Sequence, residues 1–162
     1  MKTCKHLLIL GTALTLLLTS CQKESVTTRS TPDTTDTLFG NTPPPAWTVS
    51  PNYDYSNSMT AVVSVDLTKS YSSTDNSWQL SPEDKLGAFA DDQCVGVASP
   101  TDSLFFLFIV PPPPSTSENP ITLRYYSAKL RNIFYADITF PFQNGGRQGS
   151  AAMPLRPKWS TR

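Results

Sequence analysis

Histidine is nearly absent from this chain of 162 residues. The one histidine, His6, lies in an N-terminal segment that has the features of an export signal, so the exported chain would contain none. Without an imidazole there is no Ser-His-Asp triad, no histidine general base and no histidine metal ligand. The composition therefore argues against an enzyme, and neither a metal nor a cofactor is predicted.

Long hydrophobic runs are also missing. The apolar stretch at residues 7–18 has about a dozen residues, and the next longest, 104–110, is shorter still. A transmembrane helix needs roughly 20 apolar residues, so neither stretch is predicted to span a bilayer. The first follows Lys2 and Lys5 and precedes small residues, which is the pattern of a secretory signal. We therefore assign residues 1–20 to a signal peptide.

Cysteine is scarce, and the position of one cysteine is informative. Leu18-Thr19-Ser20-Cys21 resembles the lipobox of bacterial lipoproteins. The resemblance implies that Cys21 is lipidated, becomes the new N-terminus and anchors the chain in the outer membrane, where two or more acyl chains make anchoring stable. The alternative is an ordinary secretory signal in which Cys21 is incidental. Gln22-Lys23-Glu24 is similar to the export tag of Bacteroidota surface lipoproteins, although a chance polar sequence would look the same, so the periplasmic and outward-facing orientations both stay open.

The remaining cysteine and the charge balance exclude further classes of function. Cys94 would be the only thiol of the exported chain besides Cys21, so no intrachain disulfide is predicted. It lies in an alternating run and is expected to act as a small buried hydrophobe rather than a nucleophile. Removal of Lys2 and Lys5 leaves 11 of the 13 basic residues against 13 acidic ones, a net charge of −2. No basic patch stands out, so nucleic acid is not a predicted partner.

Residues 21–46 are predicted to form a disordered linker that starts at the lipidated cysteine. Serine, threonine and proline dominate it, and it offers too little apolar surface to offset the entropy of ordering. Its expected role is to hold a folded domain away from the membrane. Thr34 and Thr37 follow aspartates in short sequences that resemble Bacteroidota O-glycosylation sites, so both are candidate glycosylation positions.

From residue 47 onward the apolar residues alternate with polar ones, which is the period of a β-strand. Strands are predicted over residues 59–67, over 86–90 and 94–98 as a hairpin with its turn at Asp91-Asp92, and over 121–126 and 133–140. The apolar run 104–110 is predicted to be a central strand buried on both faces. Residues 150–155 are expected to form a last edge strand. No helix longer than the turn at residues 81–84 is expected.

These elements predict an all-β domain over residues 47–162. Six to seven short strands in about 110 residues indicate an antiparallel Ig-like β-sandwich, and a domain of this size can bury a single core. Parts of it, namely residues 58–65, 84–89 and 92–98 with Ile121-Thr122-Leu123-Arg124-Tyr125-Tyr126-Ser127-Ala128, are similar to a β-sandwich module of Bacteroidota secreted and surface proteins. The resemblance implies location and fold, because no enzymatic activity is established for such modules. Val95 stands where the module often has arginine.

Aromatic residues near strand ends and in loops are the main candidates for ligand binding. Exposed rings can stack on sugars or anchor a protein partner, although they can also seal the ends of a sandwich. The candidates are Tyr71 and Trp78, which flank a polar loop, together with Trp47, Tyr53 and Tyr55. Trp159 belongs to the same group of rings.

Acidic residues offer weaker candidates. Asp84, Asp91 and Asp92 could in principle hold calcium, but a solvated hairpin tip explains them better. Glu83 and Glu118 would have to face each other across about 5–10 Å to cleave a glycoside, and their loop positions do not favour this.

Three hypotheses for function follow from the sequence. The first is a lipid-anchored, non-enzymatic surface module that binds a glycan or a protein partner. The second is a structural or assembly subunit of a surface complex, joined through edge strands. The third, an enzyme, is disfavoured by the missing histidine.

Overall fold

The computed structural model describes residues 40–50, 55–68 and 79–162. Cys21, Thr34, Thr37, Tyr53, Tyr71 and Trp78 lie outside the described residues, as do the signal peptide and most of the predicted linker. Within the described part of the chain, no helix has the length and apolar character needed to cross a membrane. The helical structure there is one 3-10 turn, η1 (Tyr55–Asn57).

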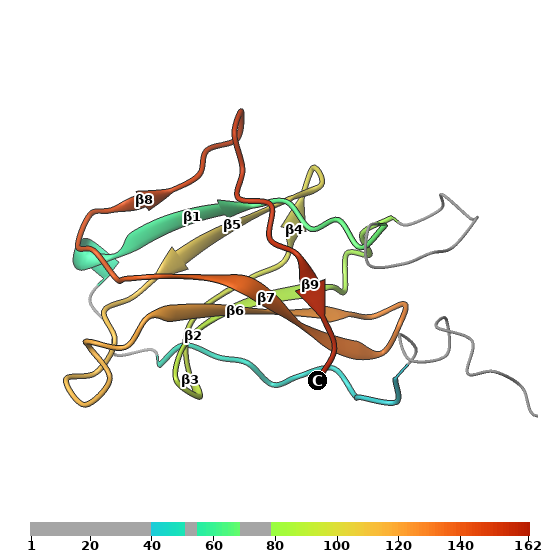
Figure 1. Ribbon diagram of the computed structural model, residues 1–162, viewed down its shortest axis with the longest axis horizontal. Helices are drawn as coiled ribbons and strands as arrows, with labels where there is room; N and C mark the ends of the chain where they lie inside the picture. The colour runs from blue at the N-terminus through green and yellow to red at the C-terminus, as the bar shows by residue number, and fades with distance from the viewer. Residues whose placement is uncertain (1–39, 51–54, 69–78) are drawn as a thin grey trace, which may run out of the picture. The chain divides into compact units, whose positions relative to one another are not determined.

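The described residues form nine strands in two sheets. The strands are β1 (Met59–Val63), β2 (Lys85–Ala90), β3 (Gln93–Ala98), β4 (Pro100–Thr101), β5 (Leu104–Ile109), β6 (Ile121–Ser127), β7 (Asn132–Phe140), β8 (Arg147–Gln148) and β9 (Trp159–Ser160). One sheet has the order β4-β5-β1-β8 and the other the order β3-β2-β6-β7-β9. Figure 1 shows the two sheets as layers, with β1, β5 and β8 above β2, β6 and β7.

The predicted fold class is confirmed, because the strands build an antiparallel-dominated β-sandwich. Among the pairs of named strands in the described residues, β1 with β8 is parallel and the others are antiparallel. Asp91 and Asp92 form the predicted turn between β2 and β3, and Asp91 has a φ of 54°. The six longer strands match the six to seven expected, and β4, β8 and β9 contain two residues each.

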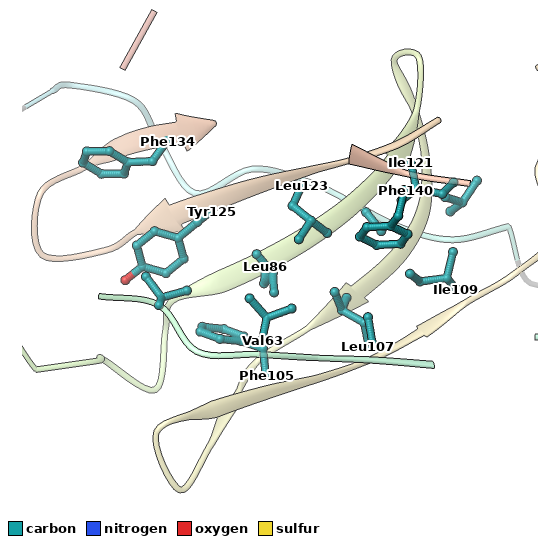
Figure 2. Packing of buried hydrophobic residues seen from close by; sticks show 14 of the residues in the cluster. Val63, Leu86, Phe105, Leu107, Ile109, Ile121, Leu123, Tyr125, Phe134 and Phe140 are labelled. Atoms are coloured by element: carbon teal, nitrogen blue, oxygen red, sulfur yellow. The ribbon is translucent and has the colours of Figure 1, made fainter. Parts of the chain in front are cut away.

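The core lies between the two sheets and follows from the alternation in the sequence. The side chains of Met59, Ala61 and Val63 point inward from β1 and are fully buried. Figure 2 shows Phe105 and Leu107 of β5 facing Leu123 and Tyr125 of β6 across the interior. Burying a side chain of this size contributes about 1.5–3 kcal/mol, so this one layer of side chains supplies most of the stabilisation.

The prediction that residues 104–110 are buried on both faces is wrong. The strand β5 alternates, with Phe105, Leu107 and Ile109 buried, whereas Phe106 is 42% exposed and Phe108 is 59% exposed. The strand does lie between β4 and β1, but the outer face of its sheet is not covered at these two rings. A continuous apolar run is therefore not a sign of burial on both faces here.

The prediction of an edge strand at residues 150–155 is also wrong. Strand pairing falls instead at β8 and β9, and Leu155 makes a single parallel bridge to Val63. Ser150 and Met153 close a local turn through the Ser150 N–H and the Met153 carbonyl. The predicted strand at 59–67 is shorter than expected as well, since β1 ends at Val63, although Val65 and Leu67 are buried as the alternation requires.

Residues 40–47 lie against the outer face of the five-stranded sheet. The Gly40 N–H donates to the Leu130 carbonyl, and the Thr42 N–H donates to the Arg131 carbonyl. Trp47 packs edge-on against Phe89, with ring centroids 5.3 Å apart. Phe89 is buried although it points away from the core cluster, because this segment covers it. Residues 40–46, which the sequence analysis placed in the linker, thus form part of the folded domain.

Candidate functional site

A cavity of about 510 Å³ lies at one end of the sandwich. It is bordered by the chain just after β1, by the segment before β2 and by the β4–β5 hairpin. Its lining residues are Ser64, Val65, Gln79, Leu80, Pro82, Pro100, Asp102 and Ser103. Pockets that bind small molecules are commonly about 300–1,000 Å³, so the cavity has the size of a ligand site.

The β4–β5 hairpin brings Asp102 and Ser103 to the cavity. Thr101 pairs with Leu104, so Asp102 and Ser103 are the two turn residues. Both have positive φ, at 48° and 70°. A two-residue turn with both residues in the left-handed region matches the twist of the flanking strands. Aspartate tolerates this region better than most residues do.

A buried carboxylate holds the segment before β2, which contributes lining residues to the cavity. Asp84 is 1% exposed, and its carboxylate oxygens accept three hydrogen bonds. Oδ2 accepts from the Tyr125 hydroxyl at 2.6 Å and from the Ser81 N–H at 2.9 Å, and Oδ1 accepts from the Ala128 N–H at 2.8 Å. Ser81 stands between the lining residues Leu80 and Pro82. Asp84 therefore fixes the segment before β2 to β6 and sets the position of that part of the lining.

The same contact makes the domain less stable at alkaline pH. Burial raises the pKa of Tyr125 well above its ordinary value of 10.0, and the hydrogen bond to Asp84 raises it further. Above about pH 10 the unfolded chain loses this proton while the folded chain keeps it, so folding stability falls as the pH rises. The contribution is about 1.4 kcal/mol per pH unit.

We expect Tyr125→Phe to remove this component. Because the variant has no hydroxyl to titrate, the stability advantage of the wild type over it should shrink by roughly 1.4 kcal/mol between pH 9 and pH 11. Urea unfolding at a series of pH values measures both proteins side by side. Two parallel curves of stability against pH would contradict this assignment.

The chemistry of the cavity lining is polar but carries little charge. Ser64 and Ser103 supply hydroxyl groups, Gln79 supplies an amide, and Asp102 supplies the one carboxylate among the described lining residues. Leu80, Pro82 and Pro100 supply apolar surface. No lysine or arginine is among these residues. Such a lining suits a ligand that carries several hydroxyl groups and some apolar surface better than it suits an anion.

The described candidates among the aromatic residues do not form one site. Trp47 is half-buried and lies over β2 of the five-stranded sheet. Tyr55 is 53% exposed and precedes β1 in the four-stranded sheet. Trp159 is buried in the core beside Tyr125, with ring centroids 5.8 Å apart. Tyr53, Tyr71 and Trp78 lie outside the described residues, so their role as ligand-binding residues stays a prediction.

The acidic residues of the sequence analysis are also separated. Asp84 precedes β2, whereas Asp91 and Asp92 follow it and are exposed at the hairpin tip. Glu83 and Glu118 are exposed at opposite ends of the β2–β6 pair. Among the described residues, no group of three or more His, Cys, Asp or Glu side chains is placed to hold a metal ion.

Arg124 organises the outer face of the five-stranded sheet. Its guanidinium donates to the Asp91 carbonyl at 2.9 Å and to Asp92 Oδ1 at 2.7 Å. It also lies 4.1 Å from the centre of the Phe89 ring. Asp92 is almost fully exposed, so this ion pair contributes little to stability. The arrangement orients the β2–β3 turn rather than forming a pocket.

Cys94 is half-buried on β3. Burial raises the pKa of its thiol, and a backbone hydrogen bond at Gly96 and the charge of Arg124 oppose this to a lesser extent. The Sγ–H donates to the Gly96 carbonyl at 3.4 Å. A raised pKa lowers the thiolate fraction at neutral pH, so the thiol is a poor nucleophile here.

The outer face of the four-stranded sheet carries an apolar strip that the sequence analysis missed. Phe106 pairs with Val62 and Phe108 pairs with Thr60, and residues directly opposite each other share a face. Thr60 also pairs with Arg147 of β8, so Phe108, Thr60 and Arg147 lie side by side across three neighbouring strands. The signal was present in the sequence as Phe-Phe-Leu-Phe, but the apolar run hid the alternation.

The comparisons with known proteins add no relative. No protein-family model, curated protein or solved structure matches this chain. The functional interpretation therefore depends on the residues and the geometry alone.

Proposed function

We propose that this protein is a lipid-anchored, non-enzymatic module of the outer membrane that binds a glycan or a protein partner. The lipobox-like sequence ending at Cys21 supports the anchor, and the mature chain without histidine argues against acid–base catalysis. The module would act at the end of a linker that gives it reach from the bilayer.

The cavity at the end of the sandwich carries the binding proposal. It is concave, has the volume of a small-ligand site and combines polar and apolar lining residues. Its walls come from three separate parts of the chain, and both the Asp84 hydrogen bonds and the β4–β5 turn hold them in place. A preorganised wall reduces the entropy that a ligand must overcome on binding.

Labelling and binding experiments test the two halves of this proposal. Growth with an alkyne fatty acid is expected to tag the wild type and leave Cys21→Ser untagged. The purified Cys21→Ser chain is then screened on a glycan array and by crosslinking on intact cells. Absence of the lipid tag would refute the anchor, and absence of any glycan or protein ligand in both screens would refute the binding function.

A second candidate function is that of an assembly subunit, and the apolar strip favours it. Phe106 and Phe108 are both more than one third exposed on neighbouring outward positions. Exposed aromatic residues are enriched at protein interfaces relative to the rest of the surface. A surface complex would bury them without changing the fold.

The double substitution of Phe106 and Phe108 by serine tests this second candidate. We expect stability to stay within about 1 kcal/mol of the wild type, because both rings are already in contact with water in the folded domain. Crosslinking on cells is expected to lose any stable complex that the wild type forms through this face. A complex that survives the double substitution would count against assembly through the strip.

A further inference from the structure

The cavity differs from a general binding surface in the kinds of polar group it offers. Hydroxyl groups and a primary amide both donate and accept hydrogen bonds, whereas a carboxylate only accepts. Ser64, Ser103 and Gln79 supply the first kind, and Asp102 supplies the second. A ligand that forms hydrogen bonds with all of these groups must itself carry several groups that donate and accept hydrogen bonds.

Charge narrows the class of ligand further. Among the described residues that line the cavity, Asp102 is the only charged one, so its field disfavours phosphates, sulfates and carboxylates. A simple amine would pair with Asp102 but could not accept hydrogen bonds from the two hydroxyls and the amide. A neutral polyol meets both conditions, because vicinal hydroxyls can donate to the two oxygens of one carboxylate.

The apolar part of the cavity lining is consistent with the same class of ligand, a neutral polyol. Leu80, Pro82 and Pro100 present aliphatic carbon atoms to the cavity. Sugar rings carry C–H groups on their faces between their hydroxyls, so they bury apolar surface while they make polar contacts. A cavity of about 510 Å³ has room for one or two sugar units rather than a long chain.

We propose that this cavity is a binding site for a neutral saccharide, with Asp102 accepting hydrogen bonds from adjacent ring hydroxyls. The inference rests on the proposed binding function and specifies its ligand as a sugar rather than a protein. The positive φ values of Asp102 and Ser103 place both residues in a tight two-residue turn at the border of the cavity, where both are exposed.

The test uses the Cys21→Ser chain on an array of neutral oligosaccharides of glucose, galactose, mannose and N-acetylglucosamine. Sialylated and sulfated glycans serve as charged probes on the same array. We expect retention of neutral glycans. Asp102→Asn should weaken binding about 10- to 100-fold, because it removes a charged acceptor. Asparagine tolerates the left-handed region as aspartate does, so this variant is expected to keep the turn.

Asp92→Asn is the matched control. Asp92 also occupies a two-residue hairpin turn and is highly exposed, but it lies at the β2–β3 turn and does not line the cavity. Its substitution should leave glycan binding unchanged, and Gln79→Ala should weaken it severalfold. Thermal melts of each variant establish that the fold is kept.

Three results would overturn the sugar site. They are the absence of bound neutral glycans, retention of charged glycans only, and affinity for a bound glycan that Asp102→Asn leaves unchanged. In the first case a protein partner captured by crosslinking would leave the proposed binding function standing. In the other two cases the bound glycan itself leaves it standing, and what fails is the assignment of a neutral saccharide to this cavity.

Discussion

Asp84→Ala is expected to lower the free energy of unfolding by about 3–5 kcal/mol, which is a large part of the stability of a domain of this size. The substitution leaves the Tyr125 hydroxyl and the N–H groups of Ser81 and Ala128 without their acceptor. A buried donor that loses its acceptor costs about 1–3 kcal/mol, and the two part-buried N–H groups add smaller costs. The melting temperature should fall by roughly 10–20 °C.

Thermal and urea unfolding followed by near-ultraviolet circular dichroism measure this loss. Asp137→Ala is the matched control, because the Asp137 carboxylate also accepts a backbone hydrogen bond, from the Lys158 N–H at 2.8 Å, but in an exposed position. We expect that control to cost about 1 kcal/mol or less. Equal losses in the two variants would show that the burial of Asp84 has no special effect.

Asp84→Ala should also affect the cavity. Two hydrogen bonds join Ser81 and Asp84. The Ser81 N–H donates to Asp84 Oδ2, and the Asp84 N–H donates to the Ser81 carbonyl, each at 2.9 Å. Release of this turn frees the lining residues on either side of Ser81. A variant studied below its melting temperature is therefore expected to bind ligand more weakly even though Asp84 does not touch the cavity.

Gly96→Ala is expected to destabilise the domain by about 2–3 kcal/mol. A Cβ at residue 96 would lie 2.8 Å from the carbonyl oxygen of Phe108 and 3.3 Å from Ile109 Cγ1. The first neighbour is backbone, so it cannot rotate away as a side chain can. At this point β3 and β5, which belong to different sheets, approach closely, and the Val110 N–H donates to the Val95 carbonyl at 2.9 Å.

Urea unfolding of Gly96→Ala beside Gly145→Asn separates this contact from a general effect of losing glycine. Gly145 has a φ of 65° but no atom within 4 Å of a Cβ built there, and asparagine accepts this conformation. The Asn variant is expected to lose less than about 1 kcal/mol. If Gly96→Ala is equally mild, the two strands have more room to separate than the contact distance implies.

Much of the fold could be predicted because local alternation and turn residues are strong signals. The β2–β3 hairpin follows from apolar residues on both sides of Asp91-Asp92, and β6 follows from the alternation of residues 121–126. Burial on one face or two is a property of the whole sheet, and Phe106 and Phe108 show that apolar character alone does not determine it. The prediction of a strand at residues 150–155 was wrong for a related reason. The strands on either side, β8 and β9, have two residues each, and so short a strand leaves almost no periodic pattern in the sequence.

The candidate site was harder to predict than the fold. Its lining residues come from positions 64–65, 79–82 and 100–103, and no motif links these segments in the sequence. Ser, Gln and Pro at loop positions are common on any protein surface. Asp84 looked like one more acidic residue before a strand, and only the register of β2 against β6 places Tyr125 and Ala128 beside it.

The position of residues 40–47 along the five-stranded sheet would have a mechanical consequence if the chain is held at Cys21, as we propose. A pull on that end first loads the hydrogen bonds from Gly40 to Leu130 and from Thr42 to Arg131, and then the contact between Lys85 Nζ and the Pro45 carbonyl at 3.1 Å. These bonds would open one after another, and the Trp47 ring would peel from Phe89 before any force reached β1. Under the proposed anchor, the segment would therefore lengthen the tether under shear while the sandwich and its cavity stay intact.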